Sequence, residues 1–105
     1  MKIPEIKIPK EKIITKFCLF VHTHDLALHG YFTGFYRVKG QEYIGNDSDF
    51  RNERIKFFTV KNVYKKAENL FFDFGFESSE DCIYVCSQTG KKIKRYNGVD
   101  WSMVL

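Results

Sequence analysis

The sequence predicts an all-β (β-rich) domain, built as a single small barrel or sandwich of about six to seven short antiparallel strands. The composition favours strands, because 11 Phe, 6 Tyr and 1 Trp stand against only two Ala, and aromatic residues are enriched in strands. Apolar and polar residues also alternate in several short runs, which turn-forming residues separate. At most one short helical turn is expected, near residues 63–69, where apolar residues recur at helical spacing.

Residues 1–10 are expected to form an extended N-terminal arm, and residues 11–105 a single β domain. Pro4 and Pro9 lack a backbone donor and favour an extended conformation at the preceding Ile, which predicts an extended segment. A chain of 105 residues is long enough for one hydrophobic core. Because the arm carries apolar side chains on a chain end, we expect it to contact a partner or a second copy of the chain.

Four strands are expected between the arm and the helical turn, at residues 13–21, 31–38, 41–44 and 54–60. Both faces of the first strand carry apolar residues, which predicts a central position in the sheet. Gly34 interrupts the second strand and indicates a bulge, because a glycine inside a strand often marks one. Gly40 and the turn-forming residues 45–49 bound the third strand.

The strongest alternation lies in residues 70–76, where every second side chain is large and apolar. Strand side chains point alternately to opposite faces, so this run predicts a half-buried strand with one aromatic ridge. The side chains expected in the core are Leu70, Phe72, Phe74 and Phe76. Asp73 and Glu77 are expected to face solvent.

The last part of the chain predicts a hairpin and a docked tail. Residues 82–86 and 91–96 read as two strands around a turn at 87–90. Gly98 ends the hairpin, and the tail that follows is rich in apolar residues. We expect this tail to pack on the body of the protein or on a partner.

Charge and cysteine content narrow the class of protein. The net charge of +4 favours anionic partners but is below that of dedicated polyanion binders. Basic residues gather towards both ends and acidic residues at 73–81, which predicts a surface with two oppositely charged regions. Three cysteines, no secretory signal and no apolar run of about 18 residues predict a cytoplasmic protein that does not enter a membrane.

The histidines give the sharpest chemical hint in the sequence. His22 and His24 fall on one strand face about 6.6 Å apart, a spacing that suits two ligands of one metal, and His29 follows closely. Strand-end histidines without a metal are the preferred interpretation, and a small metal-dependent enzyme at these three residues is the third functional hypothesis. No cofactor and no catalysis are expected. Cys18 and His22 share a strand face, but the sequence specifies no third group to orient them, and the paired carboxylates lie in loops of turn-forming residues.

A basic segment near the C-terminus supports an alternative function, the binding of single-stranded nucleic acid by a small β-barrel. Basic side chains can contact phosphates while an aromatic ring stacks on a base. On a regular strand, Lys92, Lys94 and Tyr96 would share one side. The residues expected to bind nucleic acid are Lys91, Lys92, Lys94, Arg95 and Tyr96.

The preferred function is a non-catalytic small β module that binds another protein or associates with itself. Exposed aromatic residues, a surface with two charge signs and an extended arm suit a module of this kind. An accessory or inhibitor protein of a phage or mobile element would fit this size and composition. The residues expected to contact the partner are Ile3, Ile6, Ile8, Tyr31, Phe35 and Trp101.

Overall fold

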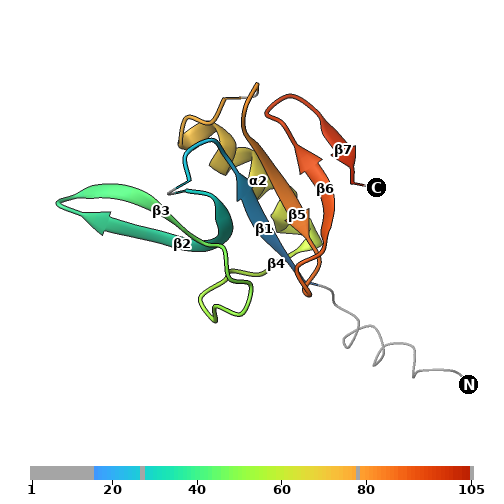
Figure 1. Ribbon diagram of the computed structural model, residues 1–105, viewed down its shortest axis with the longest axis horizontal. Coiled ribbons are helices and arrows are strands. Elements are labelled where there is room, and N and C mark those ends of the chain that lie inside the picture. The colour runs from blue at the N-terminus through green and yellow to red at the C-terminus, as the bar shows by residue number, and fades with distance from the viewer. Residues whose placement is uncertain (1–15, 27, 78, 105) are drawn as a thin grey trace, which may run out of the picture.

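The computed structural model describes residues 16–26, 28–77 and 79–104. Within these residues, seven antiparallel strands form one sheet, and a helix of 14 residues packs on it (Figure 1). This mostly β architecture confirms the predicted fold class. The predicted arm, with Ile3, Ile6 and Ile8, lies outside the described residues.

The sheet is built around its first strand. The strands are β1 (Lys16–His22), β2 (Gly30–Val38), β3 (Gln41–Asp47), β4 (Phe58–Thr59), β5 (Cys82–Cys86), β6 (Lys92–Tyr96) and β7 (Trp101–Met103). Their spatial order is β3-β2-β1-β5-β6-β7, and β4 pairs with the start of β1. Residues 18–21 of β1 are all buried, which confirms the central position predicted from their apolar character.

The strand predicted at residues 70–76 is wrong. Helix α2 spans Val60–Asp73, and residues 74–76 follow it without joining the sheet. The apolar residues at 63, 67, 70 and 71 recur at helical spacing and form one stripe, which packs against the sheet. Phe71 is therefore buried, with 2% of its surface exposed, whereas Phe72 is 64% exposed.

The last residues of the segment predicted as a strand lie at or just beyond the end of α2. Phe74 and Phe76 are half-buried against the core, and Asp73 is exposed as predicted. The helix is longer than the single turn expected near 63–69, and it begins inside the strand predicted at 54–60, of which only β4 forms. Among the described residues, no helix is both long and apolar enough to cross a membrane.

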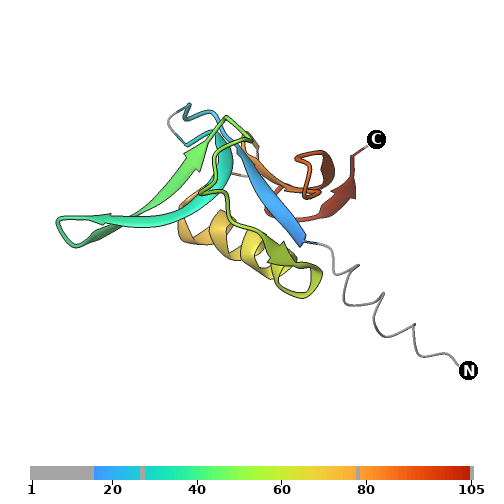
Figure 2. The same cartoon turned by 90° about the horizontal axis from the view of Figure 1, so that it is seen from below.

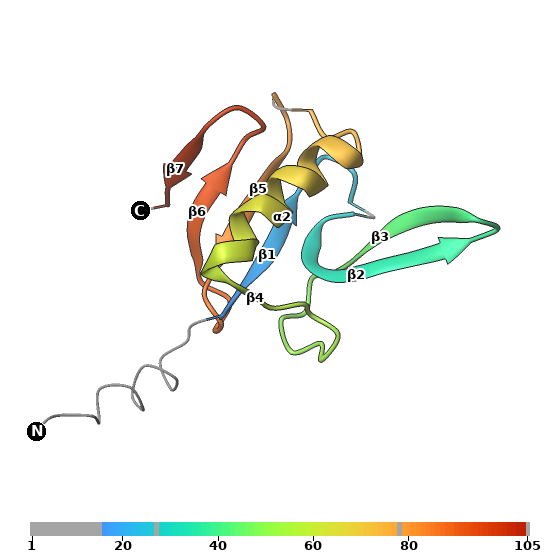
Figure 3. The same cartoon turned by 180° about the vertical axis from the view of Figure 1, so that it is seen from behind.

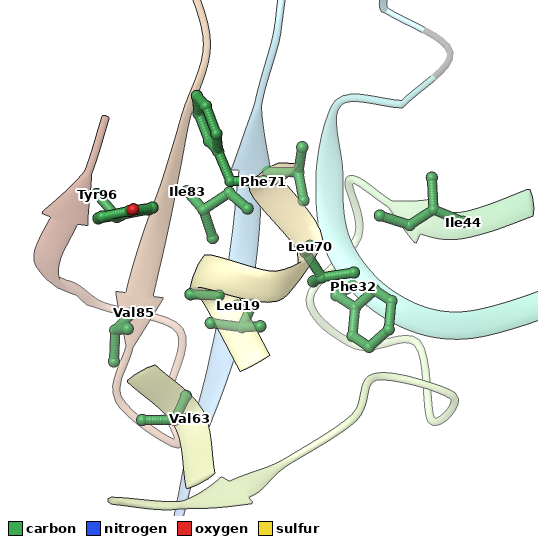
Figure 4. Close-up of a cluster of buried hydrophobic side chains, with 11 residues drawn as sticks. Leu19, Phe32, Ile44, Val63, Leu70, Phe71, Ile83, Val85 and Tyr96 are labelled. Atoms are coloured by element: carbon green, nitrogen blue, oxygen red, sulfur yellow. The ribbon is translucent and has the colours of Figure 1, made fainter. Parts of the chain in front are cut away.

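The main core lies between α2 and one face of the sheet, which the helix crosses in Figure 3. Figure 4 shows helix side chains meeting side chains of the strands in this core. The buried residues are Leu19, Val21, Phe32, Ile44, Val63, Ala67, Leu70, Phe71, Ile83, Val85 and Tyr96.

A second, smaller cluster lies on the opposite face of the sheet. Its buried members are Cys18, Phe20, Ile55 and Cys86, with Tyr31, Phe50 and Tyr84 packed against them. Ile55 and Phe50 belong to the loop between β3 and β4, so this loop covers part of the face that α2 leaves open. All three cysteines are free and buried.

The C-terminal tail packs on the body of the protein, which was one of the two positions expected for it. β7 pairs with β6, with Trp101 opposite Tyr96. The indole Nε1 of Trp101 donates a hydrogen bond of 3.0 Å to Oε2 of Glu68 in α2. Its ring lies 4.9 Å from the ring of Tyr64, between centroids. β7 is therefore part of the fold and joins the sheet to the helix.

Replacing Trp101 with alanine should lower the free energy of unfolding by about 2 kcal/mol, because a half-buried aromatic side chain and one hydrogen bond are lost. The matched control is Met103→Ala in the same strand, because Met103 is 62% exposed. This control should change the free energy of unfolding by about 0.5 kcal/mol or less. Urea denaturation of the two variants measures both values, and equal losses would contradict the docking of Trp101.

Candidate interaction surfaces

The β2–β3 hairpin projects away from the rest of the sheet. Figure 1 and Figure 2 show its outer half extending beyond the body of the protein, with β3 at the edge of the sheet. Lys39 and Gly40 form the connecting turn with φ angles of 53° and 83°. Two positive φ angles at the central residues favour a type I′ turn, which continues the twist of the two strands and keeps the hairpin closed.

One side of the hairpin packs on the body near its base. Phe35 stacks on Phe74, with ring centroids 5.5 Å apart, and the ammonium of Lys66 lies 5.7 Å from the Phe35 ring. Ile44, opposite Phe35 in β3, is buried. Phe32 reaches the same core because a bulge between Phe32 and Gly34 shifts the alternation. The bulge indicated by Gly34 in the sequence is therefore confirmed.

The other side of the hairpin carries three exposed apolar side chains, Tyr36, Val38 and Tyr43, which we name the hairpin patch. Their exposed fractions are 52%, 48% and 39%, respectively. Tyr36 and Tyr43 are cross-strand partners, and their rings stack with centroids 5.5 Å apart and an interplanar angle of 21°. The patch therefore presents a preformed aromatic surface on a projecting element.

A second surface lies on the side of the sheet opposite α2. The strand registers place Tyr31, Phe20, Tyr84 and Arg95 opposite one another across β2, β1, β5 and β6. The ammonium of Lys92 lies 4.4 Å from the Phe20 ring and 5.3 Å from the Tyr84 ring. We name His22, Tyr84, Lys92 and Arg95 the open sheet face, because no described helix covers them.

The structure divides the basic segment predicted to bind nucleic acid. A bulge between Val85 and Cys86 places Lys92 opposite Cys86, so Lys92 shares the open sheet face with Arg95. Tyr96 is 6% exposed in the main core, and the ammonium of Lys94, on that same side of β6, lies 5.5 Å from the Tyr64 ring. Lys91 is exposed in the turn before β6. The grouping of Lys92 with Lys94 and Tyr96, expected for a regular strand, is wrong.

The three histidines do not converge on one point. The rings of His22 and His29 lie 4.9 Å apart between centroids, and Nδ1 of His29 accepts a hydrogen bond of 3.3 Å from the Thr23 backbone. His24 turns away to Asp81, where its Nδ1 lies 3.0 Å from Oδ1 of the carboxylate. In the described ranges, no three His, Cys, Asp or Glu side chains are arranged to hold a metal ion.

Charged groups of opposite sign shift the pKa values of His24 and His22. The pKa of His24 is raised by Asp81, Glu80 and Glu77, chiefly through the Asp81 hydrogen bond. On the open sheet face, the pKa of His22 is lowered by partial burial first, and then by His29, Lys92 and Arg95. Asp81 opposes this shift, so Lys92 and Arg95 share the surroundings of His22 with one carboxylate.

The remaining predicted contact residues have different environments. Tyr31 is half-buried, and its hydroxyl donates a hydrogen bond of 3.2 Å to the Gly90 carbonyl. Trp101 belongs to β7 and packs on the main core. Phe35 is 43% exposed at the base of the hairpin. Tyr36, Val38 and Tyr43 were not among the contact residues predicted from the sequence, although the Lys-Gly turn between the two tyrosines indicated that they could pair across a hairpin.

Comparisons of the chain with protein-family models, with curated proteins and with solved structures found no match. The function is therefore inferred from the chemistry of the two surfaces.

Proposed function

We propose that this protein is a non-catalytic module that binds another protein through the hairpin patch. The observation that carries the proposal is the exposure of Tyr36, Val38 and Tyr43, at 52%, 48% and 39%, on an element that projects from the body. Contiguous exposed apolar side chains on a small protein mark sites of interaction. Tyrosine in particular is enriched in protein interfaces, because its ring is apolar and its hydroxyl tolerates water.

The hairpin patch also loses little conformational freedom when it binds. Tyr36 and Tyr43 already stack on each other in the free protein, so fewer rotamers remain to be fixed by the partner. The type I′ turn at Lys39 and Gly40 fixes the tip. A preorganised aromatic hairpin is suited to an apolar groove on the partner, with polar groups of the partner around the two hydroxyls.

The edge strand β3 adds a second means of recognition. It is the last strand on its side of the sheet, so one row of its backbone groups has no neighbouring strand among the described residues. An extended segment of a partner can pair with such an edge through main-chain hydrogen bonds.

The three buried, free cysteines support the expectation that this binding takes place in a reducing, cytoplasmic compartment.

The double variant Tyr36→Ser/Tyr43→Ser should bind its protein partner about 30-fold more weakly, because two central aromatic contacts are lost. The experiment uses the tagged full chain to capture proteins from a lysate of its natural host, with and without nuclease, followed by affinity measurement with the purified partner. The control is Val99→Ser, which removes an apolar side chain of 71% exposure from the β6–β7 turn. Both variants change exposed positions, so both should remain folded.

Two results would contradict the proposal. One is a captured protein that binds wild type and the double variant with equal affinity. The other is a set of captured proteins that nuclease removes completely, because this would make nucleic acid the bound species.

A further inference from the structure

We propose that the open sheet face binds single-stranded nucleic acid, with Tyr84 stacking on a base and Lys92 and Arg95 contacting phosphates. This site is separate from the hairpin patch. It lies on β1, β5 and β6, whereas the hairpin patch lies on β2 and β3. The inference therefore does not depend on the proposed function.

The first support is the register of the sheet. Arg95 lies directly opposite Tyr84, and Tyr84 lies directly opposite Phe20. The bulge in β5 and β6 adds Lys92 to the same face, where its ammonium is 5.3 Å from the Tyr84 ring. Two cations thus flank one aromatic ring, which is the combination that sequence-tolerant recognition of single strands uses.

The second support is charge complementarity. Lys92 and Arg95 both lower the pKa of His22. The His22 ring lies 6.4 Å from the Tyr84 ring, between centroids. Asp81 acts in the opposite direction on the pKa of His22, and its carboxylate already accepts hydrogen bonds from the His24 backbone and the Glu77 backbone. With 2% of its surface exposed, Asp81 does not present its charge to a ligand. The accessible charge of the open sheet face is therefore positive and favours a polyanion.

The third support is the limited size of the uncovered area. Tyr31 and Phe20 pack under the β3–β4 loop, where the Tyr31 ring lies 5.1 Å from that of Phe50. The side chains left for contact are those of His22, Tyr84, Lys92 and Arg95, and they suit a short stretch of strand. In a duplex the bases are stacked on one another, so none would offer a free face to the Tyr84 ring. The occupant is consequently a flexible strand whose bases are free to stack.

The test measures fluorescence anisotropy of a labelled 12-nucleotide oligo(dT) with the full chain over a series of salt concentrations. Wild type should bind more tightly than the roughly 10⁻⁴–10⁻⁶ M typical of nonspecific binding at physiological salt. Lys92→Gln/Arg95→Gln should reduce the slope of log affinity against log salt by about 1.4, because each lost phosphate contact removes about 0.7. Tyr84→Leu should weaken binding about tenfold.

The matched control is Lys61→Gln/Lys94→Gln, which removes the same charge from α2 and from the other side of β6. It should leave the slope unchanged. Circular dichroism at the assay temperature establishes that each variant is folded, and the tyrosine and charge variants test the site independently. The hairpin variant Tyr36→Ser/Tyr43→Ser should bind the oligonucleotide as wild type does, which separates this site from the protein-binding one.

Three outcomes would overturn the inference. Wild-type binding that falls within the nonspecific range of roughly 10⁻⁴–10⁻⁶ M, or is weaker, would contradict the existence of the site. Equal slope changes in the site variant and the charge control would reduce the binding to general electrostatic attraction. Undiminished affinity of Tyr84→Leu would leave an anion-binding surface without base stacking, and single-stranded nucleic acid would no longer be its ligand.

Discussion

Replacing Phe71 with alanine should lower the free energy of unfolding by about 3–5 kcal/mol, whereas Phe72→Ala should cost about 1 kcal/mol or less. Phe71 is 2% exposed and Phe72 is 64% exposed, although they are neighbours in the sequence. The Phe71 ring lies 5.7 Å from that of Tyr96 and 5.9 Å from that of Phe76. Its removal would leave a cavity at the junction of helix and sheet, and cavities in a packed core are costly.

The surroundings of Phe71 leave little room for relaxation into this cavity. A Cβ on Gly98 would lie 2.4 Å from Cε1 of Phe71, so the ring rests on the Gly98 backbone. Gly98 has a φ of 93°, which a residue with a side chain rarely adopts. Urea denaturation monitored by circular dichroism measures both variants. A larger loss for Phe72→Ala than for Phe71→Ala would restore the predicted strand and contradict helix α2.

Asp81→Asn should lower the free energy of unfolding by about 2–3 kcal/mol near pH 5, because the buried carboxylate is a shared acceptor. Oδ2 accepts a hydrogen bond of 2.7 Å from the Glu77 backbone, and Oδ1 accepts one of 3.2 Å from the His24 backbone. The His24 ring nitrogen also lies 3.0 Å from Oδ1. The side-chain amide of an asparagine would point its NH2 group at one of these backbone N–H groups. That N–H group would then have no acceptor.

The effect of Asp81→Asn should depend on pH in a defined direction. Burial raises the pKa of Asp81, but the hydrogen bonds from Glu77, His24 and Thr23 outweigh burial and hold it below its ordinary value. The stability from Asp81 is therefore complete above the unfolded-state pKa of about 3.9 and is lost as the pH falls through the folded pKa. The pKa of His24 is raised. Its contribution is complete below about pH 6.5 and is lost as the pH rises through the folded pKa.

The difference in stability between wild type and Asp81→Asn should thus be largest between about pH 4 and 6.5 and should shrink on both sides. Urea denaturation at intervals from about pH 3 to 9 measures this profile. His24→Gln is the control, because it should remove only the decrease on the alkaline side. A difference that stays constant over the whole range would contradict the His24–Asp81 interaction.

The fold class could be predicted from the sequence because two local properties indicate it. Aromatic residues favour strands, and turn-forming residues mark where strands end. The hairpins around Gly40 and Gly90 were both expected and both form. The strand prediction for residues 70–76 was wrong because the alternation covers few residues. The segment also includes the end of an apolar helical stripe that starts at Val63. A pattern of this length is compatible with both the strand period and the helix period. Packing against β1 and β5 selects the helix.

The two surfaces were less predictable than the fold. Bulges at Gly34 and in the β5–β6 pair each change which side chains share a face. A one-residue shift moves every following side chain to the other side of a strand, so Lys92 joins Arg95 and Tyr96 joins the core. The exposure of Tyr36 and Tyr43 depends on the hairpin leaving the body, which no local pattern encodes.

The proposed function requires that the hairpin patch contacts a protein. The most direct test replaces Tyr36 with a benzoylphenylalanine and irradiates the full chain in its host cells, with the same photoreactive residue at Val99 as a control. Both positions are exposed, at 52% and 71%, but only Tyr36 belongs to the hairpin patch. We expect one discrete cross-linked protein from position 36, resistant to nuclease, and none from position 99. No cross-linked protein from position 36, or the same products from both positions, would contradict the claim.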